Sequence, residues 1–191
     1  MWKGVQVNGK TYGLPVDSGP NALFYNKAIF GKAGVTSVPT TWQEYYEAAK
    51  KIHALGSDYY ITSDAGDNNQ STVFMSLIAQ AGGKPFTVDG EKIGIDLTGD
   101  AGTRKTVNYW QKMIDEGLVN TKTAGWTDDW TKGHNDRTIA TPLTGAWMPY
   151  NLLSGAPSGA GQWRVGNVPT WTSGCSEHHG NGGPPRAGTH D

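Results

Sequence analysis

The arrangement of apolar residues constrains this chain more than any other feature of its sequence. Short apolar segments typical of strands alternate with longer segments of helical periodicity up to about residue 171, and this alternation predicts an α/β fold. Residues 174–191 contain five Gly, two Pro and no Leu, Ile, Val, Met or aromatic residue, so they cannot form a core. We therefore expect one folded unit over residues 1–172. We expect residues 173–191 to be a Gly/Pro/His-rich tail that is disordered or ordered only by an oligomer contact.

Local signals place the first elements of this fold. Asn8-Gly9 between β-type residues predicts a tight hairpin turn, because both residues tolerate positive φ. Residues 21–26 (NALFYN) are short, apolar and aromatic, which is typical of a buried strand. Thr41 followed by Glu44 has the spacing of a capping box at the start of an amphipathic helix.

The remaining elements are predicted from the same kinds of signal. In chain order they are a strand at 59–62, a polar loop at 63–71, a buried helix at 72–81, a hairpin at 86–96, an amphipathic helix at 102–116, an irregular segment at 118–137, a strand and turn at 138–147, a short helix near 149–154 and a strand near 163–169. Val107, Trp110, Met113 and Ile114 are expected to share the buried face of the helix at 102–116.

Composition excludes several classes of protein. The formal net charge of −1 argues against a nucleic-acid binder driven by bulk charge. No run of 18 apolar residues suggests a membrane span, and the single cysteine, Cys175, cannot form an internal disulfide. The chain is rich in Gly (27 residues), Pro (10) and Trp (8), and all the Trp lie within residues 1–171. Such a composition fits a protein that binds sugars or other small polar ligands, although it does not decide the function.

The order and spacing of several motifs resemble the family 1 extracellular solute-binding proteins of sugar-type ABC transporters over about residues 4–172. The motifs are Gly9 to Pro15 (GKTYGLP), Asp17, Leu23 to Lys27 (LFYNK), Pro39 to Glu44 (PTTWQE), Ile78 to Gly83 (IAQAGG) and Gly145 to Trp147 (GAW). Members of this family are about twice as long and have two α/β lobes that hold a carbohydrate between them. The resemblance therefore implies one lobe, mainly the second, of a periplasmic-binding-protein type II fold, incomplete at both ends. It implies weak, non-covalent carbohydrate binding without a cofactor.

The resemblance and the side-chain chemistry together suggest candidate ligand-binding residues. Sugars need aromatic faces for their C–H groups and hydrogen-bonding partners for their hydroxyls. Trp147, in the turn that begins at Gly145, matches a family position that often stacks on the ligand. The other candidates are Asp17 and Ser18 after the first crossing strand, Asn69, Gln70 and Thr72 in the loop before the buried helix, and Trp126 and Trp130 in the irregular segment. Trp126 and Trp130 are equally compatible with a covering loop, whereas Trp42, Trp110, Tyr45 and Tyr46 are expected to pack in the core.

A second hypothesis is a metal-dependent hydrolase whose site is built at an oligomer interface. Thiolate and imidazole ligands suit zinc or another divalent transition metal, and the tail supplies Cys175, His178, His179 and His190. His134 lies upstream of these residues. The sequence contains no HExxH frame, no pair of CxxC motifs, no GxSxG elbow and no P-loop, so no motif of an established enzyme class supports catalysis.

Partners and location follow from the same observations. A missing lobe would expose apolar surface, which predicts a homodimer or higher oligomer. The resemblance implies an extracytoplasmic protein. The N-terminal residues show no apolar segment typical of a signal peptide, so the chain as written is expected in the cytoplasm.

Overall fold

Strand β3 (Ala22–Asn26) lies at the centre of the fold. The computed structural model describes residues 5–14 and 20–172, except for the side chains of residues 68–70. β3 pairs antiparallel on one side with β8 (Leu143–Thr144) and on the other with β9 (Trp163–Gly166). It carries five residues of mostly apolar and aromatic character, and a strand with neighbours on both edges leaves no backbone group of its ladder unpaired.

The segment that leads into β8 joins this sheet to a second one. On one side the Asn26 amide donates to the Ala140 carbonyl at 3.0 Å. On the other side the Ala140 amide donates to the Tyr60 carbonyl, also at 3.0 Å, and the Thr141 amide donates to the Ile61 carbonyl. Ile61 leads into β4 (Thr62–Ser63), which pairs parallel with β7 (Val119–Asn120). The two sheets therefore form one mixed layer in the order β9, β3, β8, β4 and β7.

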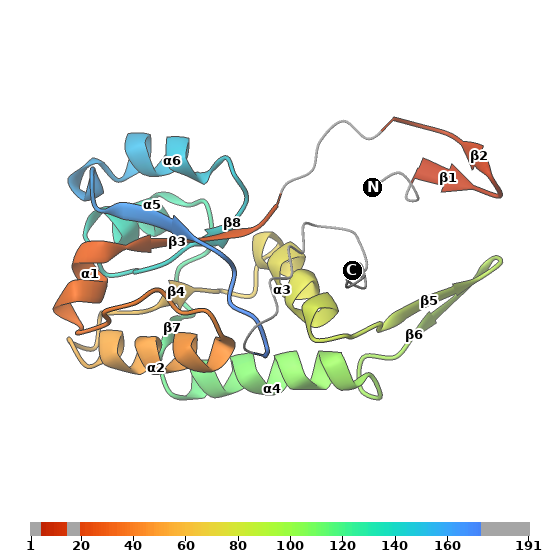
Figure 1. Cartoon of the computed structure of the whole chain (residues 1–191), viewed down its shortest axis with the longest axis horizontal. Helices are drawn as coiled ribbons and strands as arrows, with labels where there is room; N and C mark the ends of the chain where they lie inside the picture. Colours follow the sequence, from red (N-terminus) through yellow and green to blue (C-terminus); the bar gives the residue numbers. More distant parts are fainter. Residues whose placement is uncertain (1–4, 15–19, 173–191) are drawn as a thin grey trace, which may run out of the picture.

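Helices cover the layer on both faces because β3 alternates its side chains. Leu23 points into the main core, which is built from α1 (Lys27–Lys32), α2 (Trp42–His53) and α4 (Ala101–Asp115). Phe24 points the other way and packs with Trp130, Met148 and Leu152 from α5 (Asp128–Asn135) and α6 (Met148–Gly155). Figure 1 shows α2 and α4 on one side of the strands and α5 and α6 on the other.

The chain that follows β9 packs against α3 (Asn68–Gln80) and the helices of the main core. The Trp42 indole N–H donates to Gln80 Oε1 at 2.7 Å, and Gln80 Nε2 donates to the Pro169 carbonyl at 3.0 Å. The ring of Trp171 lies edge-on to Tyr109, with 5.3 Å between the ring centroids. Segments from both halves of the sequence therefore meet in one aromatic cluster.

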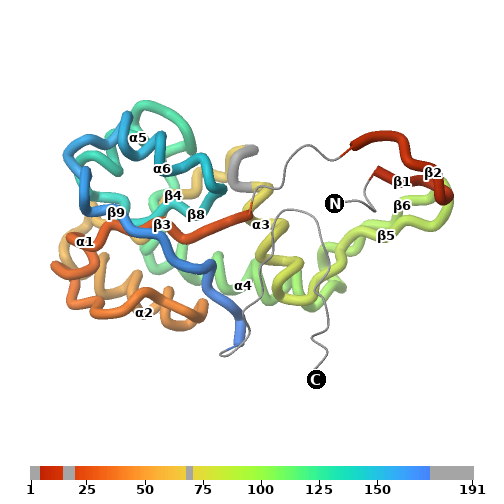
Figure 2. Tube along the Cα trace, turned by 45° about the horizontal axis from the view of Figure 1, so that its top comes forward, coloured from red at the N-terminus to blue at the C-terminus, as the bar shows by residue number. Residues whose placement is uncertain are grey.

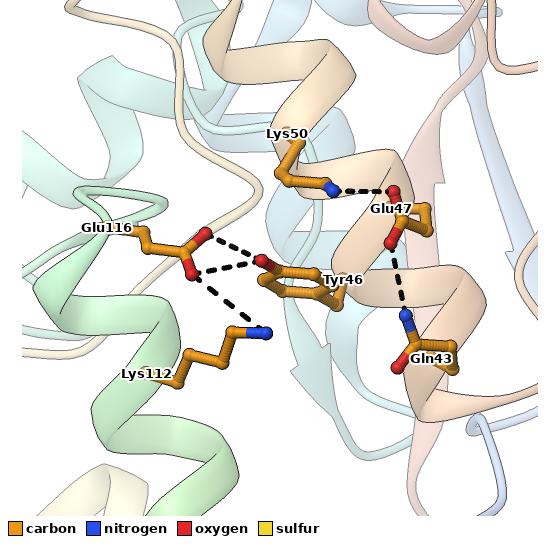
Figure 3. A network of polar contacts seen from close by, with 6 residues as sticks. All are labelled: Gln43, Tyr46, Glu47, Lys50, Lys112 and Glu116. Atoms are coloured by element: carbon orange, nitrogen blue, oxygen red, sulfur yellow. Dashed lines mark hydrogen bonds and ion pairs between the residues drawn. The ribbon is translucent and has the colours of Figure 1, made fainter.

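A polar network fastens α2 to the end of α4 at the protein surface (Figure 3). The Tyr46 hydroxyl donates to the Glu116 carboxylate at 2.7 and 2.9 Å. Lys112 lies over the Tyr46 ring, with Nζ 4.0 Å from the centroid, and also approaches Glu116. On α2 itself, Lys50 forms an ion pair with Glu47. The hydrogen bond from Tyr46 to Glu116 is the part of this network that links α2 to the end of α4. Hydrogen bonds to a charged acceptor contribute more to stability than exposed ion pairs do.

Two hairpins lie away from the helical body, as Figures 1 and 2 both show. The first joins β1 (Gln6–Val7) to β2 (Lys10–Thr11), and the second joins β5 (Phe86–Asp89) to β6 (Lys92–Ile95). A short 3-10 helix, η2 (Pro157–Gly159), completes the elements of the described residues. None of the described helices is both long and apolar enough to cross a membrane.

The predicted α/β class, the hairpin turn at Asn8-Gly9, the strand at 21–26 and the Thr41–Glu44 capping box are confirmed. Several predictions were wrong. The helix predicted to be buried at 72–81 is buried only at Leu77 and Ile78, and its Met75 is 38% exposed, because it covers the layer with one side only. Residues 68–71 are helical rather than loop, residues 128–135 form α5 within the segment predicted to be irregular, and Val107 is 42% exposed. The helical residues 68–71 and 128–135 were missed because both segments are mostly polar and show no apolar periodicity.

Candidate functional site

Trp147 stands at the exposed end of β8, where α6 begins. It is the N-cap residue of α6, and its side chain is 49% exposed. The ring folds back over the buried Gly145, so that a Cβ added to Gly145 would lie 2.4 Å from the Trp147 ring atoms. Only glycine leaves room for this arrangement. The GAW turn therefore presents a large aromatic surface to solvent from a fixed position.

Trp126 forms a second exposed aromatic surface, and its backbone is strained. Its φ of +66° lies in the left-handed region that non-glycine residues rarely adopt, and its side chain is 43% exposed. The ring lies against Trp130, with 5.0 Å between centroids, and Trp130 is itself buried. The preceding Gly125 amide donates to the Asp67 carboxylate at 2.7 Å, which attaches this loop to the residues before α3. The surrounding contacts therefore hold Trp126 in its unusual conformation.

A shallow hollow of about 30 Å³, here called the front hollow, brings these elements together. Its lining residues come from β4, α3, the Trp126 loop, α5 and the end of β8, and they are Thr62, Val73, Gly125, Trp126, Trp130, Pro142, Leu143 and Thr144. Thr144 directly precedes Gly145, and Val73 directly follows the exposed Thr72. Of the predicted ligand-binding residues, Trp126 and Trp130 line the hollow, Thr72 and Gly145 are sequence neighbours of lining residues, and Trp147 does not line it.

A larger cavity, here called the α5–α6 cavity, lies between α5 and α6 and has a volume of about 230 Å³. Its lining residues are Trp126, Trp130, Thr131, His134, Met148, Asn151, Leu152, Ser154, Gly155 and Ala156. Trp126 and Trp130 line both this cavity and the front hollow. The sequence did not indicate this cavity, because α5 was not predicted and because His134 was considered only as a metal ligand.

The electrostatic character of both spaces is neutral. Neither lining contains Asp, Glu, Lys or Arg. The titratable group among the lining residues is His134 of the α5–α6 cavity, whose Nδ1 lies 2.8 Å from the Trp130 carbonyl oxygen. Burial lowers the pKa of His134 to about 4, against the opposing effect of that hydrogen bond, so the imidazole is neutral at physiological pH. An uncharged ligand fits such surroundings better than a phosphate or a carboxylate.

Several predicted residues lie outside the described part of the structure. Asp17 and Ser18 fall there, as do Cys175, His178, His179 and His190 of the metal hypothesis. Asn69 and Gln70 lie in the first turn of α3, and their side chains are not described. Within residues 5–14 and 20–172, no group of three or more His, Cys, Asp and Glu is arranged to hold a metal ion. His134, the one metal candidate that is described, packs between Trp130 and Trp163 instead.

Comparison with known proteins identifies the family. The family model of the bacterial extracellular solute-binding proteins matches residues 2–180. The chain belongs to this family. A similar solved structure is the ABC-transporter-associated binding protein of B. animalis subsp. lactis Bl-04 in complex with β-1,6-galactobiose, at 55% identity and a TM-score of 0.80 over 89% of this chain.

Two further relatives agree with this assignment. The galacto-N-biose/lacto-N-biose I-binding protein of Bifidobacterium longum is 30% identical with a TM-score of 0.77 over 95% of this chain. The lactose-binding protein of Rhizobium radiobacter is 25% identical over 85% of this chain. The chain spans 42% and 44% of the two solved chains and 37% of the curated relative. The expected family and fold class are therefore confirmed, with the chain corresponding to part of the longer proteins.

Burial of His134 predicts a specific dependence of stability on pH. The folded-state pKa of about 4 lies below the ordinary value of 6.5, so between these values the unfolded chain binds a proton that the folded protein does not. The free energy of unfolding should therefore fall as the pH drops from about 6.5 to about 4, by about 3 kcal/mol in total for this group. Urea unfolding of the wild type and of His134→Phe, at several pH values, measures the difference. Parallel stability curves for the two proteins across this range would contradict the assignment.

Proposed function

We propose that the protein binds a neutral oligosaccharide, without covalent chemistry, against the exposed rings of Trp126 and Trp147. The observation that carries this proposal is the pair of exposed rings of Trp126 and Trp147, each oriented by its local backbone, with Trp126 lining an uncharged front hollow. Gly145 makes room for the ring of Trp147, and the positive φ of Trp126 directs the ring of Trp126 toward solvent. Aromatic faces of this kind suit the C–H faces of sugars.

The remaining candidate residues extend this proposed site. Thr72 is exposed on the first half of α3, next to Val73 of the front hollow. Asp17, Ser18, Asn69 and Gln70 carry the hydroxyl-binding groups that the aromatic rings do not supply. Trp130 is buried beneath Trp126 and supports its ring rather than presenting a face of its own. The galactose-containing disaccharides bound by the two similar solved proteins are the first ligands to test.

Affinity is expected to be weak, because the solved relatives are more than twice as long as the matched region. A ligand face that stays open to solvent lacks the contacts that a second lobe would make with it. The lobe described here is therefore expected to contact the sugar from one side.

Calorimetric titration with β-1,6-galactobiose tests this function. We expect binding in the wild type and about tenfold weaker binding in Trp147→Ala, because the loss of one stacking surface costs about 1.4 kcal/mol. Tyr150→Ala is the matched control, since Tyr150 is an exposed aromatic residue on α6 that is not among the proposed ligand-binding residues. Glycerol 3-phosphate should not bind the neutral site. Absence of heat with every neutral disaccharide, or equal binding by Trp147→Ala, would refute the proposal.

We also propose that two copies associate through the β5–β6 hairpin. Phe86 pairs with Ile95 and Val88 with Ile93, so all four side chains lie on one face of the hairpin. They are between 48% and 75% exposed, and β5 and β6 pair only with each other among the described strands. Residues 173–191 contain no large apolar residue that could cover this face. The same face of a second copy is its natural complement, because isologous contacts match like with like.

Light scattering at tens of micromolar measures this association. The wild type should form a dimer or larger species. Val88→Lys should shift the population to monomer, because it places a charge in the centre of the apolar face. Thr87→Lys is the matched control on the opposite face of the same strand and should leave the mass unchanged. A monomeric wild type would disprove the proposal.

A further inference from the structure

The residues that line the α5–α6 cavity fall into two groups that differ in exposure. One group contributes little accessible surface, because each member is at most 7% exposed, and it consists of Trp130, His134, Met148, Leu152 and Ala156. The accessible surface therefore belongs to the other group, which consists of Trp126, Thr131, Asn151, Ser154 and Gly155. Apart from one indole ring and one glycine, this second group carries hydroxyl and amide side chains.

The polar side chains of the cavity leave hydrogen-bonding groups unused. Asn151 Nδ2 lies 3.2 Å from the Trp147 carbonyl oxygen, which can only accept, so Nδ2 donates there and Oδ1 stays available as an acceptor. Ser154 Oγ donates to the Tyr150 carbonyl at 2.9 Å and keeps its lone pairs. The Thr131 hydroxyl has no hydrogen-bond partner within the described part of the chain, so it can both donate and accept.

These groups come from two helices that approach each other closely. Asn151, Ser154 and Gly155 are spaced i, i+3 and i+4 on α6, so they share one side of that helix. Thr131 lies opposite them on α5, and a Cβ added to Gly155 would lie 2.7 Å from Thr131 Cγ2. Glycine at position 155 leaves room for Thr131, which is therefore packed against α6.

Size and charge narrow the kind of ligand that suits the cavity. Its volume of about 230 Å³ exceeds the about 150 Å³ of an apolar cavity that accommodates benzene, so a six-membered ring with hydroxyl substituents has the right size. The lining contains no Asp, Glu, Lys or Arg, which favours an uncharged ligand. An apolar ring would displace water from Asn151 and Ser154 without replacing its hydrogen bonds, whereas the hydroxyls of a sugar replace them.

The cavity adjoins the proposed sugar site at Trp126. This side chain lines both the α5–α6 cavity and the front hollow, and it is 43% exposed. A sugar unit stacked on the Trp126 ring therefore lies beside both spaces. A ligand longer than a disaccharide can occupy both of them at once.

We propose that the α5–α6 cavity is an additional subsite, which binds a further hexose unit of a neutral oligosaccharide that extends past Trp126. The hydroxyls of this unit donate to Asn151 Oδ1 and Ser154 Oγ, and one of them exchanges a hydrogen bond with Thr131 Oγ1. The subsite rests on the proposed binding of sugar at Trp126 and Trp147, and it adds a preference for chain length. Trisaccharides bind more tightly than disaccharides.

Calorimetric titration of the full chain with β-1,6-galactobiose and with β-1,6-galactotriose tests this subsite. We expect the trisaccharide to bind about tenfold more tightly, which is the effect of one or two net hydrogen bonds. In a ¹H–¹⁵N correlation spectrum, the side-chain amide of Asn151 and the backbone amide of Thr131 should move with the trisaccharide and stay in place with the disaccharide.

The variant Thr131→Val removes the hydroxyl and keeps the methyl group that packs at Gly155. The advantage of the trisaccharide over the disaccharide should fall to about twofold in this variant, because one hydrogen bond is lost. Thr36→Val is the matched control, since it makes the same change in the exposed loop between α1 and α2, and it should keep the full advantage.

Equal affinity of the wild type for the two sugars would overturn the subsite and leave the disaccharide site standing. A Thr131→Val variant that keeps the full advantage of the trisaccharide would overturn the subsite as well. Absence of heat with both sugars would refute the proposed function and the subsite with it.

Discussion

The burial of strand β3 on both faces is the constraint on which the rest of the structure depends. Leu23 and Phe24 are neighbours in the sequence, yet one belongs to the core under α1, α2 and α4 and the other to the core under α5 and α6. Successive side chains of a strand point to opposite faces, so one short apolar strand holds two helical layers at a fixed separation. The segment before β8 then joins β3 to β4. It runs antiparallel to β3 and parallel to β4, and β4 runs parallel to β7, so the C-terminal ends of β4, β7 and β8 lie at one edge of the layer.

That edge explains why the candidate site is where it is. α3 follows β4, the Trp126 loop follows β7, and α6 follows β8, so all three begin at this edge, and residues of α3 and of the Trp126 loop line the front hollow. Two local features orient the exposed rings: Gly145 makes room for the ring of Trp147, and the backbone of Trp126 adopts a left-handed conformation. Strain of this kind persists where surrounding contacts hold it, and the hydrogen bond from Gly125 to Asp67 is one such contact. No charged side chain lines the front hollow, which suits the uncharged ligand that we propose.

The sequence predicted those parts of the structure that local signals determine. Thr41 and Glu44 form the expected capping box, and residues 22–26 form the expected strand. Helix α5 was missed because Trp130 and His134 are the only buried side chains among its eight mostly polar residues, too few to show a helical period. The exposed rings of Trp126 and Trp147 were named as candidates from the sequence. The conformation of Trp126 and the cavity beside His134 were not, because both depend on contacts between segments far apart in the chain.

Family membership and the exposed rings at this edge together indicate that a sugar contacts Trp126 and Trp147 of this lobe. The most direct measurement is the indole region of a ¹H–¹⁵N correlation spectrum recorded during titration with β-1,6-galactobiose. We expect the indole signals of Trp126 and Trp147 to move in a saturable manner, whereas those of the buried Trp42 and Trp110 stay in place. Unchanged signals for both exposed residues in a large excess of disaccharide would contradict it.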